Sequence, residues 1–159
     1  MSALKASGPT KRRTEVFIAV PIYREVPSQT AVALLRTTEA LNAEQISYQF
    51  CFLQGNSQVC CARNLLVQQF LETKATHLFW LDADMVWEPR QFLALLAADK
   101  DCINAPYMAK TLVPKRLNHG LGFCCVKRAV MEKLSAIAPM GKTLEGQFPQ
   151  VFQDRKSVV

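Results

Sequence analysis

The stretch HLFWLDADMVW (77–87) decides the fold. It begins with a short apolar run, which is typical of a strand in the interior of a sheet, and two carboxylates, Asp82 and Asp84, follow at once. Carboxylates placed so close together beside a buried strand repel one another unless a cation or a hydrogen-bond donor lies between them. The stretch therefore predicts a core strand with a polar site at its carboxyl end.

Similar patterns extend on both sides of this strand. The other predicted strands are VFIAVPI (16–22), YQFCFL (48–53), the weaker CINAPYM (102–108) and GFCCVK (122–127). Predicted helices follow Ser28 and Ser57 as capping residues, begin at Glu88-Pro89, and run from about Arg128 to Ala138. Strands that alternate with helices predict an α/β fold with three layers, α/β/α, and a mostly parallel central sheet.

Length and composition fit one domain with a real core. The chain has 159 residues, half of them apolar, which excludes disordered, collagenous and coiled-coil proteins. We expect a flexible basic leader at 1–14, the α/β domain at 15–139, and an irregular C-terminal tail at 140–159. No apolar run is long enough to cross a bilayer and no secretory leader is visible, so we expect a cytoplasmic protein without a transmembrane segment.

Charge is distributed unevenly along the chain. The net charge is +6, and the excess lies in residues 1–13 and 101–159. Nucleic acid or an anionic membrane could use such a surface, but a solvated tail with ordinary surface lysines explains it more simply. We therefore expect no nucleic-acid partner.

Six cysteines are present, and no pair of them has the C-x-x-C spacing of a zinc or redox site. Most lie in apolar, strand-like runs, which favours buried free thiols in a reducing compartment over disulfides. The adjacent Cys60 and Cys61 near a helix start have no neighbouring histidine in the sequence to activate a nucleophile.

Three segments follow the predicted strands: 21–23, 54–57 and 82–84. Ligands of parallel α/β sheets bind at the carboxyl ends of the strands, so we expect folding to bring these segments to one edge. Asp82 and Asp84, spaced by two in an extended chain, can point to the same side and bind Mg²⁺ or Mn²⁺ together with diphosphate oxygens. The alternative is that one of them only caps the following turn.

Three motifs resemble those of a known family. VFIAVPIY, GNSQVCCARN and HLFWLDADMVWEP, in this order and spacing, resemble the GT-A glycosyltransferases of family 2 over residues 16 to about 130. The resemblance implies a GT-A fold of the nucleotide-diphospho-sugar transferase type. It also implies a nucleotide-diphosphate sugar as donor, Mn²⁺ or Mg²⁺ as cofactor, and an unidentified sugar, lipid or protein acceptor.

The resemblance also assigns binding roles. Pro21 and Tyr23 match the strand end that holds the base and ribose, and Tyr23 either stacks on the base or only closes the strand. Arg63 matches the arginine of the A-R-N motif and serves either a phosphate or base carbonyl, or an ion pair with Asp82. The remaining matches are Asp82, Ala83 and Asp84 for the metal-binding D-x-D motif, with Asp82 and Asp84 as its ligands, and Gln54 for a base edge.

The sequence departs from the family in two ways. No acid follows the second strand, where many members read uracil, and after Asp101 the only acids are Glu132, Glu145 and Asp154, none in a recognisable motif. The chain therefore corresponds to the donor-binding half, and its general base is unidentified. The alternative function is a catalytically incomplete nucleotide-sugar-binding module, and a nucleotidyltransferase is less supported because 23–27 contains no glycine.

Other candidates have weaker support. Trp80 is expected in the core, whereas Trp87 offers an apolar platform for a sugar ring. His77 opens a strand and is expected to satisfy a backbone group. His119 is either a late metal ligand or a plain loop residue.

Overall fold

The central sheet contains the strands β1 (Glu15–Ile22), β2 (Ser47–Gln54), β3 (His77–Leu81), β4 (Cys102–Asn104) and β7 (Phe123–Lys127). Their order in the sheet is β2-β1-β3-β7-β4. The helices are α1 (Ser28–Ala43), α2 (Val59–Glu72), α3 (Pro89–Ala97) and α4 (Arg128–Ile137). The computed structural model describes residues 13–56, 58–108, 117–118, 120–143 and 146–153.

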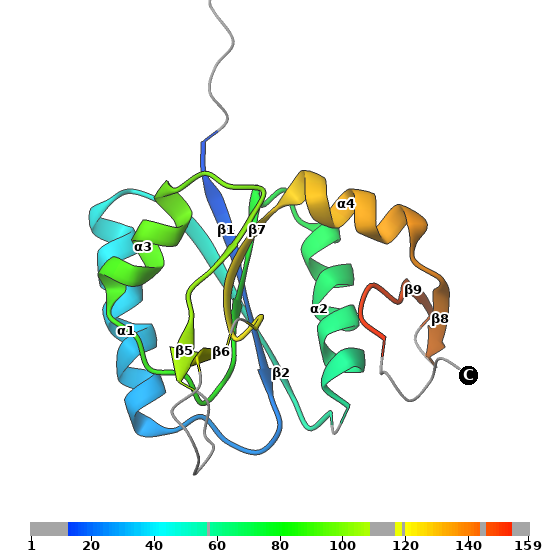
Figure 1. The fold of residues 1–159 in the computed structure, drawn as a ribbon, viewed down its shortest axis with the longest axis horizontal. Helices are drawn as coiled ribbons and strands as arrows, with labels where there is room; N and C mark the ends of the chain where they lie inside the picture. The colour runs from blue at the N-terminus through cyan, green and yellow to red at the C-terminus, as the bar shows by residue number, and fades with distance from the viewer. Residues whose placement is uncertain (1–12, 57, 109–116, 119, 144–145, 154–159) are drawn as a thin grey trace, which may run out of the picture.

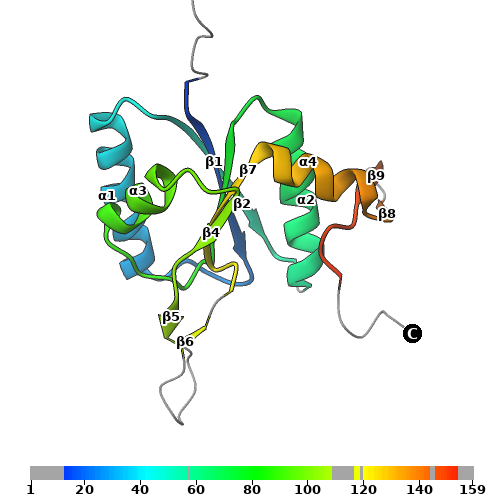
Figure 2. The same ribbon diagram turned by 45° about the horizontal axis from the view of Figure 1, so that its top comes forward.

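The helices form two layers, one on each face of the sheet. Helices α1 and α3 cover one face, and α2 and α4 cover the other, as Figure 1 and the turned view in Figure 2 show. This arrangement confirms the predicted α/β class with helices on both sides.

Strand β1 explains why a continuous apolar run is needed at the centre. Val16, Ile18 and Val20 belong to the core on the α1 and α3 side, whereas Phe17 and Ala19 belong to the core on the α2 side. Successive side chains of a strand point to opposite faces, so a strand between two helix layers must be apolar at every position.

The sheet is mixed, whereas the sequence predicted one that is mostly parallel. Strands β1, β2 and β3 pair in parallel, but β7 is antiparallel to both of its neighbours, β3 and β4. The physical reason lies in the connection, since a parallel neighbour needs a long crossover, usually a helix, and no helix separates β4 from β7 among the described residues.

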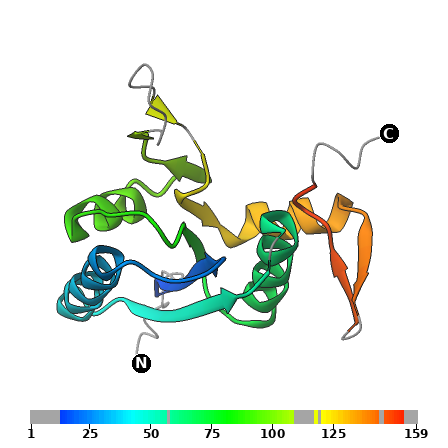
Figure 3. The same cartoon turned by 90° about the horizontal axis from the view of Figure 1, so that it is seen from below.

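The predicted strand 102–108 is divided in the structure. Only β4 joins the main sheet, and β5 (Tyr107–Met108) pairs with β6 (Leu117–Asn118) in a separate two-stranded sheet. Figure 2 and the view from below in Figure 3 show that this small sheet projects away from the main one. The interruption at Pro106 fits the break, because proline cannot donate a ladder hydrogen bond.

The C-terminal segment also differs from the prediction of an irregular tail. Residues 140–149 form a hairpin of β8 (Met140–Thr143) and β9 (Gly146–Pro149), which lies beside α2 in Figure 1. A backbone hydrogen bond of 2.8 Å from Gln150 N to Pro139 O continues the pairing. A short hairpin has neither a helical nor a long alternating pattern of apolar residues, so it could not be predicted from periodicity.

The helix starts agree with the predictions in part. Helix α3 begins at Pro89, as expected, and the structure adds a capping box of Glu88 and Gln91 at its start. Pro27 occupies the N-cap of α1, and the Ser28 side chain makes no capping hydrogen bond. The predicted cap Ser57 lies outside the described residues. Within the described part of the chain, no helix is long and apolar enough to span a bilayer.

Candidate functional site

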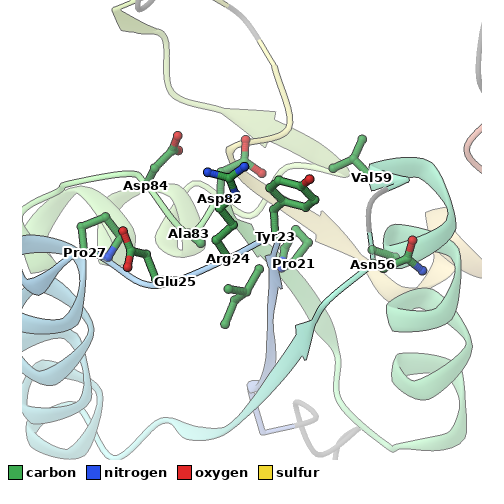
Figure 4. Close-up of a pocket in the computed structure, with 12 residues that line it drawn as sticks. Pro21, Tyr23, Arg24, Glu25, Pro27, Asn56, Val59, Asp82, Ala83 and Asp84 are labelled. Atoms are coloured by element: carbon green, nitrogen blue, oxygen red, sulfur yellow. The ribbon is translucent and has the colours of Figure 1, made fainter.

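A cavity of about 540 Å³ lies where β1, β2 and β3 end. Its walls come from the segment after β1, the start of α2 and the turn after β3, as Figure 4 shows. These are the three strand ends that the sequence predicted to meet. Because β1 pairs in parallel with both β2 and β3, the carboxyl ends of these three strands lie at the same edge of the sheet.

Five of the seven predicted binding residues line this cavity. They are Pro21, Tyr23, Asp82, Ala83 and Asp84. The other two, Gln54 and Arg63, lie next to it without being among the described lining residues.

Tyr23 is the large aromatic residue of the cavity. Its side chain is 62% exposed, and the guanidinium of Arg24 lies 5.4 Å from the centre of its ring. In Figure 4 the ring lies between the Asp82–Asp84 turn and the α2 side of the cavity, where Asn56 and Val59 are labelled. An exposed ring in this position offers a flat surface on which a planar ligand can stack.

Gln54 connects the ends of β1 and β2. Its Nε2 donates a hydrogen bond of 2.9 Å to the carbonyl of Arg24, and Gly55 N donates one of 3.1 Å to the carbonyl of Ile22. Gly55 has a φ of +84°, a conformation that favours glycine. The Gln54 amide thus orders the segment that carries Tyr23, and its reading of a base edge stays a prediction.

The D-x-D motif forms a turn and not the extended segment that the sequence predicted. Met85 N donates a hydrogen bond of 3.1 Å to Asp82 O, which closes the turn, and Asp82 N donates one of 2.9 Å to Gly122 O. The carboxylate of Asp82 is about one-third exposed, and Asp84 is exposed. The turn begins directly after β3, so both acids stay at the rim of the cavity.

Arg63 makes the ion pair that was one of its two predicted roles. Its Nη2 lies 2.8 Å from Oδ1 of Asp82, and only 13% of its side chain is exposed. Helix α2 places Arg63 behind the D-x-D turn and not in the lining. The pair balances part of the negative charge that Glu25, Asp82 and Asp84 bring to the cavity.

Asn64 binds the backbone of a residue that lies 88 positions away in the sequence, and not local backbone. Its Nδ2 donates to Phe152 O at 2.9 Å, and its Oδ1 accepts from Phe152 N at 2.8 Å. Only 3% of Asn64 is exposed, and this pairing satisfies both ends of the buried amide.

The two aspartates fit a hard divalent cation. Both offer carboxylate oxygens, the ligands that Mg²⁺ and Mn²⁺ prefer, and the ion pair with Arg63 uses one oxygen of Asp82. In the described part of the chain, no group of three or more His, Cys, Asp or Glu side chains is placed to hold a metal ion. An ion here would therefore depend on water and ligand oxygens for its other contacts, which is common for Mg²⁺.

The fold is similar to that of a glycosyltransferase. One similar solved structure is the crystal structure of a glycosyltransferase involved in the glycosylation of the major capsid of PBCV-1. The TM-score is 0.42 and the sequence identity 12%, and the match covers 73% of this chain and 62% of that chain. No family model and no curated protein matches the sequence. This likeness concerns the fold alone.

The two tryptophans near the motif are both buried. Trp80 is 1% exposed, as predicted for the core. Trp87 is 5% exposed, and its Nε1 donates a hydrogen bond of 2.9 Å to Thr37 Oγ1. The prediction of a sugar platform at Trp87 is therefore wrong, because its ring packs between α1 and the sheet. Its indole anchors the segment after the D-x-D turn instead.

The six cysteines and His77 lie in described parts of the chain. All six cysteines are free, as predicted, but only Cys124 and Cys125 are buried. His77 Nδ1 lies 2.9 Å from Thr76 Oγ1, so its partner is a side-chain hydroxyl and not the expected backbone group. Burial lowers the His77 pKa below its ordinary value more than nearby Asp99 raises it. His119, Glu145 and Asp154 lie outside the described residues, and Glu132 forms a surface pair with Arg128.

Glu25 is the lining residue of most chemical interest that sequence reasoning missed. It is exposed and belongs to the same cavity as Asp82 and Asp84. Its position three residues after β1 was the available signal, since polar residues just beyond strand ends gather at this edge.

Proposed function

We propose that this chain binds a nucleotide-diphosphate sugar in the cavity and transfers the sugar to a sugar, lipid or protein acceptor. The observation that carries the proposal is the meeting of an exposed tyrosine and two carboxylates around one cavity at the strand ends. Tyr23 offers a stacking surface for the base, and Asp82 and Asp84 would hold Mg²⁺ or Mn²⁺ beside the diphosphate. When bound, such an ion supplies Lewis-acid stabilisation of the leaving diphosphate.

Arg63 supports this arrangement from behind the turn. Its ion pair fixes the Asp82 carboxylate, so that less conformational freedom is lost when a ligand binds. Because the guanidinium is planar and always charged, it also offsets part of the negative charge of the Asp82 and Asp84 carboxylates at the rim of the cavity.

Isothermal titration calorimetry with UDP and with GDP, in the presence of Mn²⁺ or of EDTA, tests the proposal. We expect binding that requires the metal and that is lost or strongly weakened in Asp84→Asn. The matched control is Glu72→Gln, which neutralises an exposed acid at the end of α2, away from the cavity. Equal affinity in EDTA, or an Asp84→Asn variant that binds like the control, would overturn the metal-binding proposal.

The second candidate is a module that binds the donor without transferring its sugar. One observation favours it, since no described residue after Asp84 lines the cavity.

If the chain is a transferase, Glu25 is the further carboxylate of the cavity that is available to accept a proton from an acceptor hydroxyl. General-base assistance is typically worth about 10²–10⁴-fold in rate. We therefore expect Glu25→Gln to lower transfer by that factor while nucleotide affinity stays the same.

An acceptor panel separates the two candidates. Release of nucleotide is measured with and without sugar, lipid and peptide acceptors. Stimulation by an acceptor identifies a transferase, whereas metal-dependent binding without stimulation identifies the module.

A further inference from the structure

Two aromatic rings pack against the guanidinium of Arg63. Its Cζ lies 5.6 Å from the centre of the Trp80 ring and 6.0 Å from that of the Phe152 ring. The two rings meet edge to face, with their centres 5.6 Å apart and their planes at 89°. Arg63 therefore has an aromatic support as well as its ion pair with Asp82.

The hydrogen bonding of Arg63 makes this support important. Its Nη2 bonds to Asp82, but its Nε is buried and has no hydrogen-bond partner among the described residues. A single ion-pair contact allows the guanidinium to rotate, because bidentate geometry is what fixes its plane. The packing of the rings is the additional restraint on that plane.

Phe152 reaches this position through the neighbouring residue of the A-R-N motif. The Asn64 side chain makes two hydrogen bonds, of 2.9 and 2.8 Å, to the backbone O and N of Phe152. These two hydrogen bonds fix Phe152, which lies after the β8–β9 hairpin, to helix α2. The attachment point, Asn64, is the residue that follows Arg63 in the sequence. The hairpin and α2 lie side by side in Figures 1 and 2.

We infer that Asn64 and Phe152 are positioning residues, which hold the Arg63 guanidinium in the orientation that binds Asp82. Through Arg63, the segment that carries Phe152 thereby supports the Asp82 carboxylate of the D-x-D turn. The contacts connect these residues in order. Asn64 binds the backbone of Phe152, the Phe152 ring lies against the guanidinium of Arg63, and Arg63 binds the carboxylate of Asp82. The consequence for ligand binding rests on the proposed function, whereas the effect on Arg63 does not.

Nitrogen NMR spectroscopy of the arginine side chains measures the positioning directly. Rotation of the guanidinium exchanges the Nη signals, and we expect slow exchange for Arg63 in the native protein. In Phe152→Leu the exchange should be about two- to fivefold faster, the factor that corresponds to one partly exposed cation–π contact. Phe152→Tyr keeps the ring and should restore the native rate.

The matched control is Phe148→Leu. Phe148 is 4% exposed in β9, just before the segment that carries Phe152, but it has no ring contact with Arg63 among the described residues. Its replacement weakens the packing of the hairpin and should leave the Arg63 exchange rate unchanged. If Phe148→Leu and Phe152→Leu changed the rate equally, the role of Phe152 would be general packing, and the inference would be overturned.

Asn64→Ala removes both hydrogen bonds to the Phe152 backbone and should also make the Arg63 exchange faster. If this variant does not fold, Phe152→Leu still tests the inference. An unchanged Arg63 signal in folded Phe152→Leu overturns the inference. Calorimetry with Mn²⁺ and UDP or GDP then gives the functional effect, and we expect about two- to fivefold weaker binding in Phe152→Leu. If Arg63 responds as expected but the native protein binds neither nucleotide, the positioning is upheld and the proposed function fails.

Discussion

The hydrogen bond between Trp87 and Thr37 anchors the segment that follows the D-x-D turn, and its removal should destabilise the protein measurably. Thr37 is fully buried on α1, where its Oγ1 accepts from Trp87 Nε1 at 2.9 Å and donates to Ala33 O at 2.8 Å. In Thr37→Val a methyl group replaces the hydroxyl at nearly the same volume. The indole N–H then stays buried without an acceptor.

The expected cost follows from that unpaired donor. A buried polar group left without its partner costs about 1–3 kcal/mol in the free energy of unfolding. For a protein of this length, 1 kcal/mol corresponds to about 2–4 °C in Tm, so Tm should fall by about 2–12 °C. The measurement is reversible thermal unfolding followed by circular dichroism, together with denaturant titration.

Two other threonines of α1 provide matched controls for the same substitution. Thr38 is half-buried, and its Oγ1 donates to Leu35 O at 2.6 Å without accepting from any side chain among the described residues, so Thr38→Val should change the free energy of unfolding by no more than about 0.5 kcal/mol. Thr30 is 1% exposed, and its Oγ1 has no partner among the described residues, so Thr30→Val should leave stability unchanged or raise it. If Thr37→Val were as stable as Thr38→Val, the anchoring role of the indole hydrogen bond would be refuted.

Two further predictions concern titratable groups. Burial raises the pKa of Cys125 to about 12, so at about pH 8 only about one molecule in ten thousand carries the thiolate at this position. Native-state alkylation by iodoacetamide should therefore be far slower at Cys125 than at exposed Cys102. Equal labelling of the two cysteines in peptide mass spectra would contradict this prediction. Burial lowers the pKa of His77, so the folded protein binds fewer protons there than the unfolded chain does. The stability that neutral His77 contributes is complete above about pH 6.5 and falls as the pH drops from there through the folded pKa. Between about pH 7.5 and about pH 5, the native protein should therefore lose more free energy of unfolding than His77→Gln, and parallel losses would show that His77 does not contribute.

The sequence was sufficient for elements whose signal is local. The continuous apolar runs at 16–22 and 77–81 fixed two strands between helix layers, because such runs are stable only when both faces are buried. Pro89 marked the start of α3, since its missing N–H costs nothing in the first turn. The D-x-D motif could also be placed at the rim of the sheet, because it follows directly after a buried strand.

Only the tertiary structure decided how distant segments meet. The direction of β7 depends on whether a helix crossover precedes it. No local sequence pattern indicates that β7 lies between β3 and β4 in the sheet. Trp87 carries both an apolar body and a polar N–H, so its sequence context fits a buried anchor and an exposed platform equally well. The partner of Asn64 lies 88 residues away at Phe152, and a pairing over that distance is fixed by packing and not by spacing. Periodicity therefore determines which faces are buried, whereas the specific polar partners depend on the folded chain.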